Sequence, residues 1–105
     1  MVTTIVQFKV DVSMTRDQVK KVFAESTPRY QSLEGLIRKY YLISEDGRTA
    51  GGVYLWRSKV DAERCYTEEW KSRMKGIFGA VPSLSYFETP VIVDNKTHEV
   101  VHEAA

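Results

Sequence analysis

The amino-acid sequence of 105 residues predicts one small α+β domain built on an antiparallel sheet. Segments rich in β-branched and aromatic residues alternate with segments of helical spacing, in the order strand, helix, strand, strand, helix, strand. Each helical segment starts at a capping-box pattern, and an Asp-Gly pair separates the two middle strands. A chain of this length buries enough apolar surface for one core without disulfides.

The first part of the chain predicts a strand and a helix. Residues 3–10 form the first strand, because they are mostly β-branched or aromatic. The first helix begins after Thr15, which caps it together with Gln18 at the reciprocal capping-box position. Pro28 marks a break or a new helical turn, and Gly35 ends the helix.

Two strands and a second helix follow. Residues 36–44 and 50–56 form the middle strands, which the turn with the Asp-Gly pair joins. Ser58 opens the second helix as its cap, and the apolar positions of this helix share one side. We expect the helix to break once near Thr67.

The last part of the chain predicts short strands. Residues 83–89 form the fourth strand of the domain, and a short apolar run follows at 91–93. A hairpin turn is expected around residues 94–96. We therefore assign residues 1–95 to the domain and residues 96–105 to a C-terminal tail.

The order β-α-β-β-α-β predicts a ferredoxin-like fold, because right-handed crossovers place both helices on one face of an antiparallel sheet. The other face of such a sheet usually carries polar residues at alternate positions. Here the strand segments 36–43 and 51–56 carry apolar or aromatic residues in both registers. A second copy of the sheet is the simplest cover, so we predict a homodimer packed sheet against sheet.

Composition argues against several classes of partner. The chain has 15 Lys and Arg against 14 Asp and Glu, and no run of like charges, which disfavours nucleic acid and anionic membranes. RNA-recognition domains share the element order, but Ala50, Gly51 and Gly52 stand where stacking aromatic residues are needed. No apolar window reaches the ~20 residues of a membrane span. Without a signal-peptide pattern and with one cysteine, Cys65, we expect a cytoplasmic protein.

Residues 98–102 match the H-E-x-x-H pattern, which on a helix places two histidines beside a zinc ion. Only three residues follow His102, the chain has no further histidine, and the pair Val100-Val101 is more typical of a strand. We therefore interpret this segment as a solvated tail and predict no metal site.

Aromatic side chains with polar tips are numerous in the helices and strands, and they are the candidate pocket residues. Trp70 and Arg73 are the candidate catalytic residues, because three residues along a helix bring a cation to the same side, where it can face a developing anion. The candidate substrate-binding residues are Arg38, Tyr41, Tyr54, Trp56 and Tyr66. Their phenol and indole groups can stack on a flat, electron-rich molecule in an apolar pocket.

Each of these residues also has a purely structural interpretation. The aromatic side chains can fill a core or a dimer interface, and Arg73 can lie exposed on a helix. Alternation puts Tyr54 and Trp56 on the same face, which meets either the helices or the other subunit. Of the neighbours Arg38 and Lys39, one must point inward from its strand.

The segment Gly-Leu-Ile-Arg-Lys-Tyr-Tyr at 35–41, the run Ala-Gly-Gly-Val-Tyr-Leu-Trp at 50–56 and a capped helix with Ala62 resemble the YdhR-like monooxygenases. The resemblance covers about residues 3–95 and places the chain in the dimeric α/β-barrel superfamily, with the antibiotic-biosynthesis monooxygenases as relatives. It implies two sheets that close into a barrel across a dimer. The haem-degrading relatives use a helical histidine as ligand, and residues 58–80 contain none, which disfavours haem.

The resemblance implies a cofactor-independent monooxygenase that acts on a phenolic or polycyclic aromatic small molecule in an apolar pocket. In such chemistry the substrate supplies the electrons for O2, so the protein supplies a dry pocket, an anion stabiliser and oriented hydrogen bonds, and no cofactor is needed. The alternative is a non-catalytic dimeric protein that binds a small molecule or folds it as a cyclase does. Oxygen consumption with a candidate phenol distinguishes the two.

Overall fold

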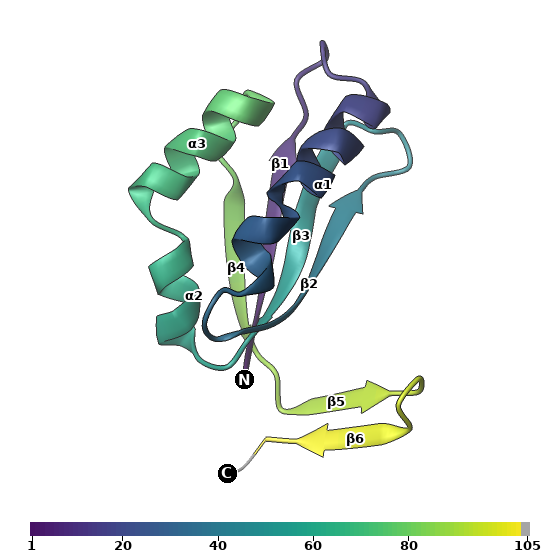
Figure 1. The fold of residues 1–105 in the computed structure, drawn as a ribbon, viewed down its shortest axis with the longest axis vertical. Helices are drawn as coiled ribbons and strands as arrows, with labels where there is room; N and C mark the ends of the chain where they lie inside the picture. Colours follow the sequence, from purple (N-terminus) through teal and green to yellow (C-terminus); the bar gives the residue numbers. More distant parts are fainter. Residues whose placement is uncertain (104–105) are drawn as a thin grey trace.

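A computed structural model, which describes residues 1–103, contains one four-stranded sheet, three helices and a separate hairpin (Figure 1). The elements are β1 (Val2–Lys9), α1 (Arg16–Gln31), β2 (Leu36–Ile43), β3 (Thr49–Trp56), α2 (Lys59–Cys65), α3 (Glu68–Phe78), β4 (Ser83–Glu88), β5 (Val91–Asp94) and β6 (Glu99–His102). The four strands of the sheet lie in the order β2-β3-β1-β4 and are all antiparallel. The predicted ferredoxin-like α+β fold is confirmed.

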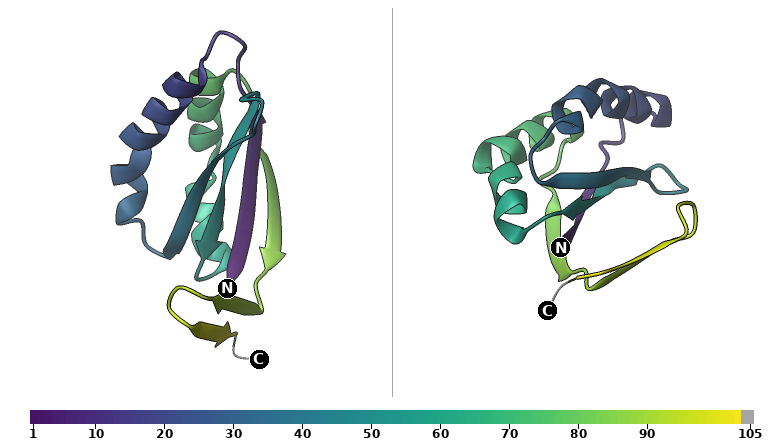
Figure 2. Two further views of the ribbon diagram at one scale, coloured as in Figure 1. Left: turned by 90° about the vertical axis from the view of Figure 1, so that its right-hand side faces the viewer. Right: turned by 60° about the horizontal axis from the view of Figure 1, so that its bottom comes forward.

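All three helices cover the same face of the sheet (Figure 2). Thr15 caps α1 in a capping box with Gln18, as predicted, and Ser58 caps α2. The predicted second helix is broken at the expected place, because Thr67 caps a new helix, α3, after α2 ends at Cys65. Side-chain caps at each start satisfy backbone N–H groups that a helix leaves without partners.

Helix α1 continues through Pro28 to Gln31, so the predicted break at this proline is wrong. Proline has no N–H to donate to the carbonyl four residues earlier, which here belongs to Ala24. The Thr27 hydroxyl donates to that carbonyl instead, at 2.9 Å. The carbonyl therefore keeps a hydrogen bond, and the last turn of α1 stays helical.

The two faces of the sheet differ in cover. Residues of β1 and β3 that face the helices are almost fully buried, among them Val6 and Trp56. The opposite face, here called the open face, leaves large apolar side chains exposed: Tyr40 by 53%, Leu42 by 41% and Phe87 by 53%. Both faces of the sheet therefore carry apolar side chains, which is the observation that led to the dimer prediction.

The C-terminal segment forms a two-stranded hairpin beyond the end of the sheet at which β1 begins and β4 ends (Figures 1 and 2). Strands β5 and β6 pair from Val91–His102 to Asp94–Glu99, so the hairpin joins residues on both sides of the predicted boundary at 95. Residues 99–102 are extended and His98 has a positive φ of 61°. The two histidines therefore do not share a helical face. No helix among the described residues is long and apolar enough to cross a membrane.

Candidate functional site

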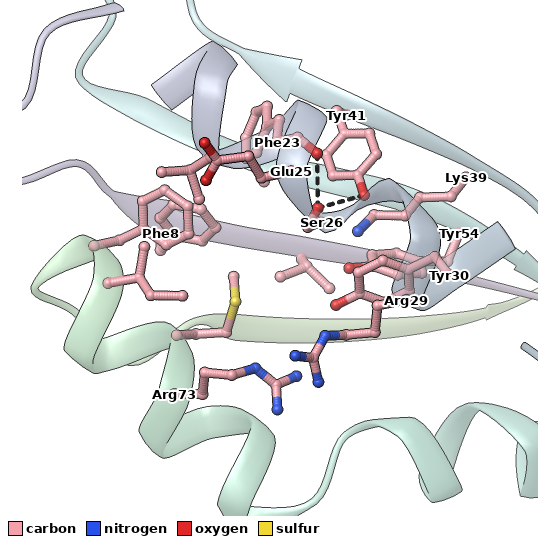
Figure 3. A pocket seen from close by; sticks show the side chains of 16 residues that line it. Phe8, Phe23, Glu25, Ser26, Arg29, Tyr30, Lys39, Tyr41, Tyr54 and Arg73 are labelled. Atoms are coloured by element: carbon pink, nitrogen blue, oxygen red, sulfur yellow. Dashed lines mark hydrogen bonds between the residues drawn. The ribbon is translucent and has the colours of Figure 1, made fainter. Parts of the chain in front are cut away.

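A cavity of about 390 Å³ lies between the sheet and the helices α1 and α3 (Figure 3). Much of its wall is apolar and comes from both layers: Val6, Phe8, Val22, Phe23, Met74 and Phe78. Its polar groups are few, as in most small-molecule sites, and include three tyrosines, one lysine and two arginines. The volume falls within the range of ~300–1,000 Å³ that such sites occupy.

Lys39 of β2 extends into the cavity and is enclosed by aromatic rings (Figure 3). Its Nζ atom lies 3.4 Å from the ring centroid of Tyr30, 3.9 Å from that of Tyr41 and 4.6 Å from that of Tyr54. We call Lys39 and these three tyrosines the cavity cluster. Ring faces attract an ammonium group, but they accept none of its protons as a carboxylate would.

The amine of Lys39 has no charged partner. No carboxylate of the described residues 1–103 lies within ion-pair distance of it. Burial lowers the pKa of Lys39 from 10.5 to about 7 and outweighs the small opposing effect of Cys65. Near neutral pH the neutral amine is therefore well populated, and a neutral amine in a cavity can accept a proton from a ligand.

Gly52 leaves the space that the side chain of Lys39 occupies. Gly52 of β3 faces the stem of Lys39, and a Cβ atom at this position would lie 3.4 Å from the Lys39 Cε and 3.1 Å from the Tyr54 ring. It would also lie 2.9 Å from the carbonyl oxygen of Tyr40, which is too close for a backbone atom. The absence of a side chain at Gly52 thus lets Lys39 lie flat against the sheet.

Hydrogen bonds fix two tyrosines of the cavity cluster. The indole N–H of Trp70 donates to the Tyr30 hydroxyl at 3.0 Å. The Tyr41 hydroxyl lies 2.7 Å from Ser26 Oγ, and because Ser26 donates its own proton to the carbonyl of Phe23, Tyr41 is the donor. Burial raises the pKa of Tyr41, which keeps this phenol protonated.

Two arginines border the cavity, Arg29 from α1 and Arg73 from α3 (Figure 3). Neither has a carboxylate within ion-pair distance among the described residues. Glu25 is the one acidic side chain of the cavity lining, and it is exposed. The cavity is therefore lined by more positive than negative charge, which favours an anionic ligand.

A second aromatic group on the same face of the sheet has no cavity. Thr4 Oγ1 lies 2.6 Å from the Tyr66 hydroxyl, and the indole N–H of Trp56 donates to both oxygens, at 3.0 and 3.3 Å. All three residues are buried, and we call them the sealed cluster. Each of their polar side-chain atoms has a hydrogen-bond partner within the group, and none of the three residues lines the cavity.

The structure does not bring all the predicted site residues together. Tyr41, Tyr54 and Arg73 line the cavity. Trp56 and Tyr66 belong to the sealed cluster, and Trp70 is 2% exposed and contacts the site through Tyr30. Their roles in catalysis and binding stay predictions.

Arg38 lies away from the cavity. It points to the open face, where its guanidinium donates to the Tyr40 hydroxyl at 3.4 Å and pairs with Asp94 of the hairpin at 3.5 Å. Its neighbour Lys39 is the inward side chain of the pair. Arg38 also lines a second cavity, of about 410 Å³, together with Tyr30, Lys39 and Tyr41, so its predicted substrate-binding role stays a prediction for that second cavity.

Among the cavity residues that were not predicted as site residues, Lys39, Arg29 and Tyr30 bear most on its chemistry. Lys39 had a signal, because a lysine in a strand next to Arg38 had an even chance of facing inward. Tyr30 had a weaker signal, its place on the apolar stripe of the first helix, and Arg29, which follows Pro28, had none. Continuity of α1 through this proline is what brings both of them to the cavity.

A comparison with protein-family models matches residues 4–87 to the family described as "Putative mono-oxygenase ydhR". A comparison with curated proteins finds no match. Several solved structures share the fold. One is described as a "putative antibiotic biosynthesis monooxygenase" from Deinococcus radiodurans, with 6% identity over 90% of this chain and 97% of that one and a TM-score of 0.69.

Two further structures have similar TM-scores. A "putative antibiotic biosynthesis monooxygenase" from Nitrosomonas europaea is 16% identical over 85% of this chain and 98% of that one, with a TM-score of 0.66. A monooxygenase from the gene ActVA-Orf6 of Streptomyces coelicolor, in complex with the ligand nanaomycin D, is 14% identical over 84% of this chain and 86% of that one, with a TM-score of 0.65. At these identities the likeness concerns the fold.

Proposed function

The chain belongs to the mono-oxygenase family that the ydhR model describes, and from that premise we propose that it oxidises a phenolic, polycyclic aromatic molecule with O2 and without a cofactor. One observation carries the proposal. Lys39 presents an amine without a charged partner to a cavity of about 390 Å³, between the rings of three tyrosines. An amine with a pKa of about 7 is a suitable base for an acidic phenol.

The shape of the cavity supports a flat ligand. Aromatic rings from both layers line it: Phe8, Tyr41 and Tyr54 come from the sheet, and Phe23 and Tyr30 come from α1. Flat aromatic ligands stack on such rings and bury most of their surface. The similar monooxygenase of Streptomyces coelicolor holds nanaomycin D, which supports a small-molecule ligand for this fold.

The first chemical step is a proton transfer. The neutral amine of Lys39 accepts the proton of the substrate hydroxyl, which leaves a phenolate beside the new ammonium group. The ammonium stabilises the phenolate charge, and the phenol of Tyr54, whose pKa burial raises, stays protonated and can donate to it. The apolar wall excludes water and strengthens both interactions.

The second step is the reduction of O2 by the substrate anion. For an anthrone, whose ring CH2 lies opposite the oxygen, the phenolate form carries electron density to that carbon. The carbon gives up two hydrogens and four electrons, one oxygen atom becomes the new carbonyl, and the other leaves as water. The overall change is CH2 + O2 to C=O + H2O, so no further reductant is needed.

Oxygen uptake with anthrones and hydroxynaphthalenes tests the proposal. We expect one O2 consumed per anthrone and a quinone product 14 Da heavier than the substrate, with 18O2 adding a further 2 Da. Lys39→Met is expected to lose the activity, whereas Lys20→Met, which removes an exposed lysine from α1, keeps it. No uptake together with saturable binding of the same compounds would overturn the enzymatic function and leave the small-molecule-binding alternative.

We further propose that two copies of the chain pair through their open faces, closing the barrel that the family resemblance implies. The open face carries Tyr40, Leu42 and Phe87, each more than two-fifths exposed, beside the half-buried Ile5 and Val53. An exposed apolar surface of this kind is typical of a protein contact surface. A two-fold axis can place the same surface of a second copy against it. Sedimentation equilibrium at micromolar concentration is expected to give a dimer, and a monomer would contradict the pairing.

A further inference from the structure

We propose that the cavity selects aromatic ligands that carry a carboxylate, which Arg29 and Arg73 bind between them, while the phenolic end of the ligand lies at Lys39. The inference rests on the proposed function only for the identity of the phenolic end. The carboxylate site itself follows from the two arginines.

The two arginines form one wall although they come from different helices. Arg29 of α1 and Arg73 of α3 both line the main cavity, and both also line a shallower cavity on their other side. Figure 3 shows their guanidinium groups directed to the same edge of the main cavity. One ligand group at that edge can therefore meet both of them.

Among residues 1–103, no carboxylate lies close enough to compensate the positive charge at this edge. The acidic side chains that line the two cavities are Glu25 and Glu69; both are exposed, and neither lies within ion-pair distance of Arg29 or Arg73. The shallower cavity adds a further arginine, Arg64, which pairs with Asp61. Two neighbouring guanidinium groups repel each other, and an anion between them removes the repulsion.

The same two arginines and Lys39 all act electrostatically on one half-buried thiol, that of Cys65. Burial raises the pKa of Cys65 to about 11, and the charges of Lys39, Arg73 and Arg29 each act against that rise. All three cations are thus within electrostatic reach of one point in the helix layer. A ligand that spans the cavity can meet the amine and the arginines together.

A carboxylate is the anion that fits this geometry best. Guanidinium groups are planar and donate two parallel N–H bonds, which match the two oxygens of a carboxylate. Arg73 is half-buried and Arg29 exposed, so a carboxylate reaches them at the edge of the cavity and keeps contact with water. The aromatic body then extends inward along the apolar wall towards Lys39.

Calorimetric titration with two matched probes tests the inference without any oxidation step. The probes are 6-hydroxy-2-naphthoic acid, with hydroxyl and carboxylate at opposite ends, and 2-naphthol, which lacks the carboxylate. We expect the acid to bind at least tenfold more tightly than 2-naphthol. Arg29→Gln and Arg73→Gln are each expected to weaken the binding of the acid about tenfold. Each should change the affinity for 2-naphthol by less than a factor of two.

Arg48→Gln is the matched control, because Arg48 is exposed in the turn between β2 and β3; it is expected to change neither affinity. Equal affinities for the two probes, no binding of either, or a preference that survives in the Arg29→Gln/Arg73→Gln double variant would overturn the inference. Oxygen uptake reports on the proposed function separately. Acid binding without uptake would overturn only the oxidation, and uptake without a preference for acids would overturn only the carboxylate site.

Discussion

The helix-covered face of the sheet carries two groups of aromatic residues that differ in what their polar atoms meet. In the sealed cluster, the hydroxyls of Thr4 and Tyr66 and the indole of Trp56 bond to one another at 2.6 to 3.3 Å. In the cavity cluster, the amine of Lys39 meets only ring faces and open volume. In the first group every polar side-chain atom has a partner within the group, and in the second the amine of Lys39 remains for a ligand.

The difference originates in one cross-strand position. Tyr54 and Trp56 are neighbours on the same face of β3, and their rings stack at 5.8 Å. On β2, however, Tyr54 pairs with Lys39, whereas Trp56 pairs with Leu36. Both clusters are rich in aromatic residues, and the difference between them is the lysine that pairs with Tyr54 across the strands.

The largest expected effect comes from removing that partner. Lys39→Met takes the base from the cavity, and we expect kcat/KM for anthrone oxidation to fall by a factor of about 100 or more. Tyr66→Phe changes only the sealed cluster, and we expect it to alter kcat/KM less than about threefold. Oxygen-electrode kinetics measures both. Similar losses in the two variants would mean that the two clusters do not differ in function.

The next effect is a pH dependence of stability that Lys39 alone produces. Its pKa is about 7 in the folded state and 10.5 in the unfolded chain, so the unfolded state binds more protons between these values and stability rises with pH. Relative to Lys39→Met, the free energy of unfolding of the natural sequence should increase by about 2 kcal/mol between about pH 7 and pH 9.

Urea denaturation of both proteins at the two pH values measures this difference. Below about pH 7 Lys39 is protonated in both states, so its burial penalty is fully present there and the difference levels off. A constant difference across the whole range would show that Lys39 keeps its ordinary pKa, and would remove the contrast between the two clusters.

The smallest effect is expected from single hydroxyl deletions. Tyr66→Phe leaves Thr4 and Trp56 with fewer partners in a buried site, and we expect it to lower the free energy of unfolding by about 1.5 kcal/mol. Tyr41→Phe removes a bond to Ser26 at a half-buried position, and about 0.5 kcal/mol is expected. Chemical denaturation of the two variants ranks them; the reverse order would contradict the assignment of Tyr66 to a closed network.

Local rules predicted most of the fold. The caps at Thr15 and Ser58 are where the sequence places them, because capping depends on residues within one turn, and the second helix breaks near Thr67 as expected. Pro28 was misread for a reason that is also local: the hydroxyl of Thr27 replaces the hydrogen bond that the proline removes. This compensation cannot be recognised without the side-chain geometry.

The site was less predictable, because it depends on where the helices leave space. Alternation groups Tyr54 with Trp56, but the volume beside Tyr54 results from the placement of α1 and α3 against the sheet. The choice between Arg38 and Lys39 depends on the register of β2 against β3, which pairs Lys39 with Tyr54. Neither the cavity volume nor the register of β2 can be predicted from the alternation of residues along one strand.

The most direct test of the account is a titration of Lys39 itself. Lysine labelled with 13C at Cε gives one NMR signal per side chain, and the signal absent in Lys39→Met identifies residue 39. The account predicts that this signal titrates with a midpoint near 7, while exposed lysines titrate near their usual ~10.4. A midpoint above about 10 for Lys39 would contradict the claim that an amine without a charged partner faces the cavity.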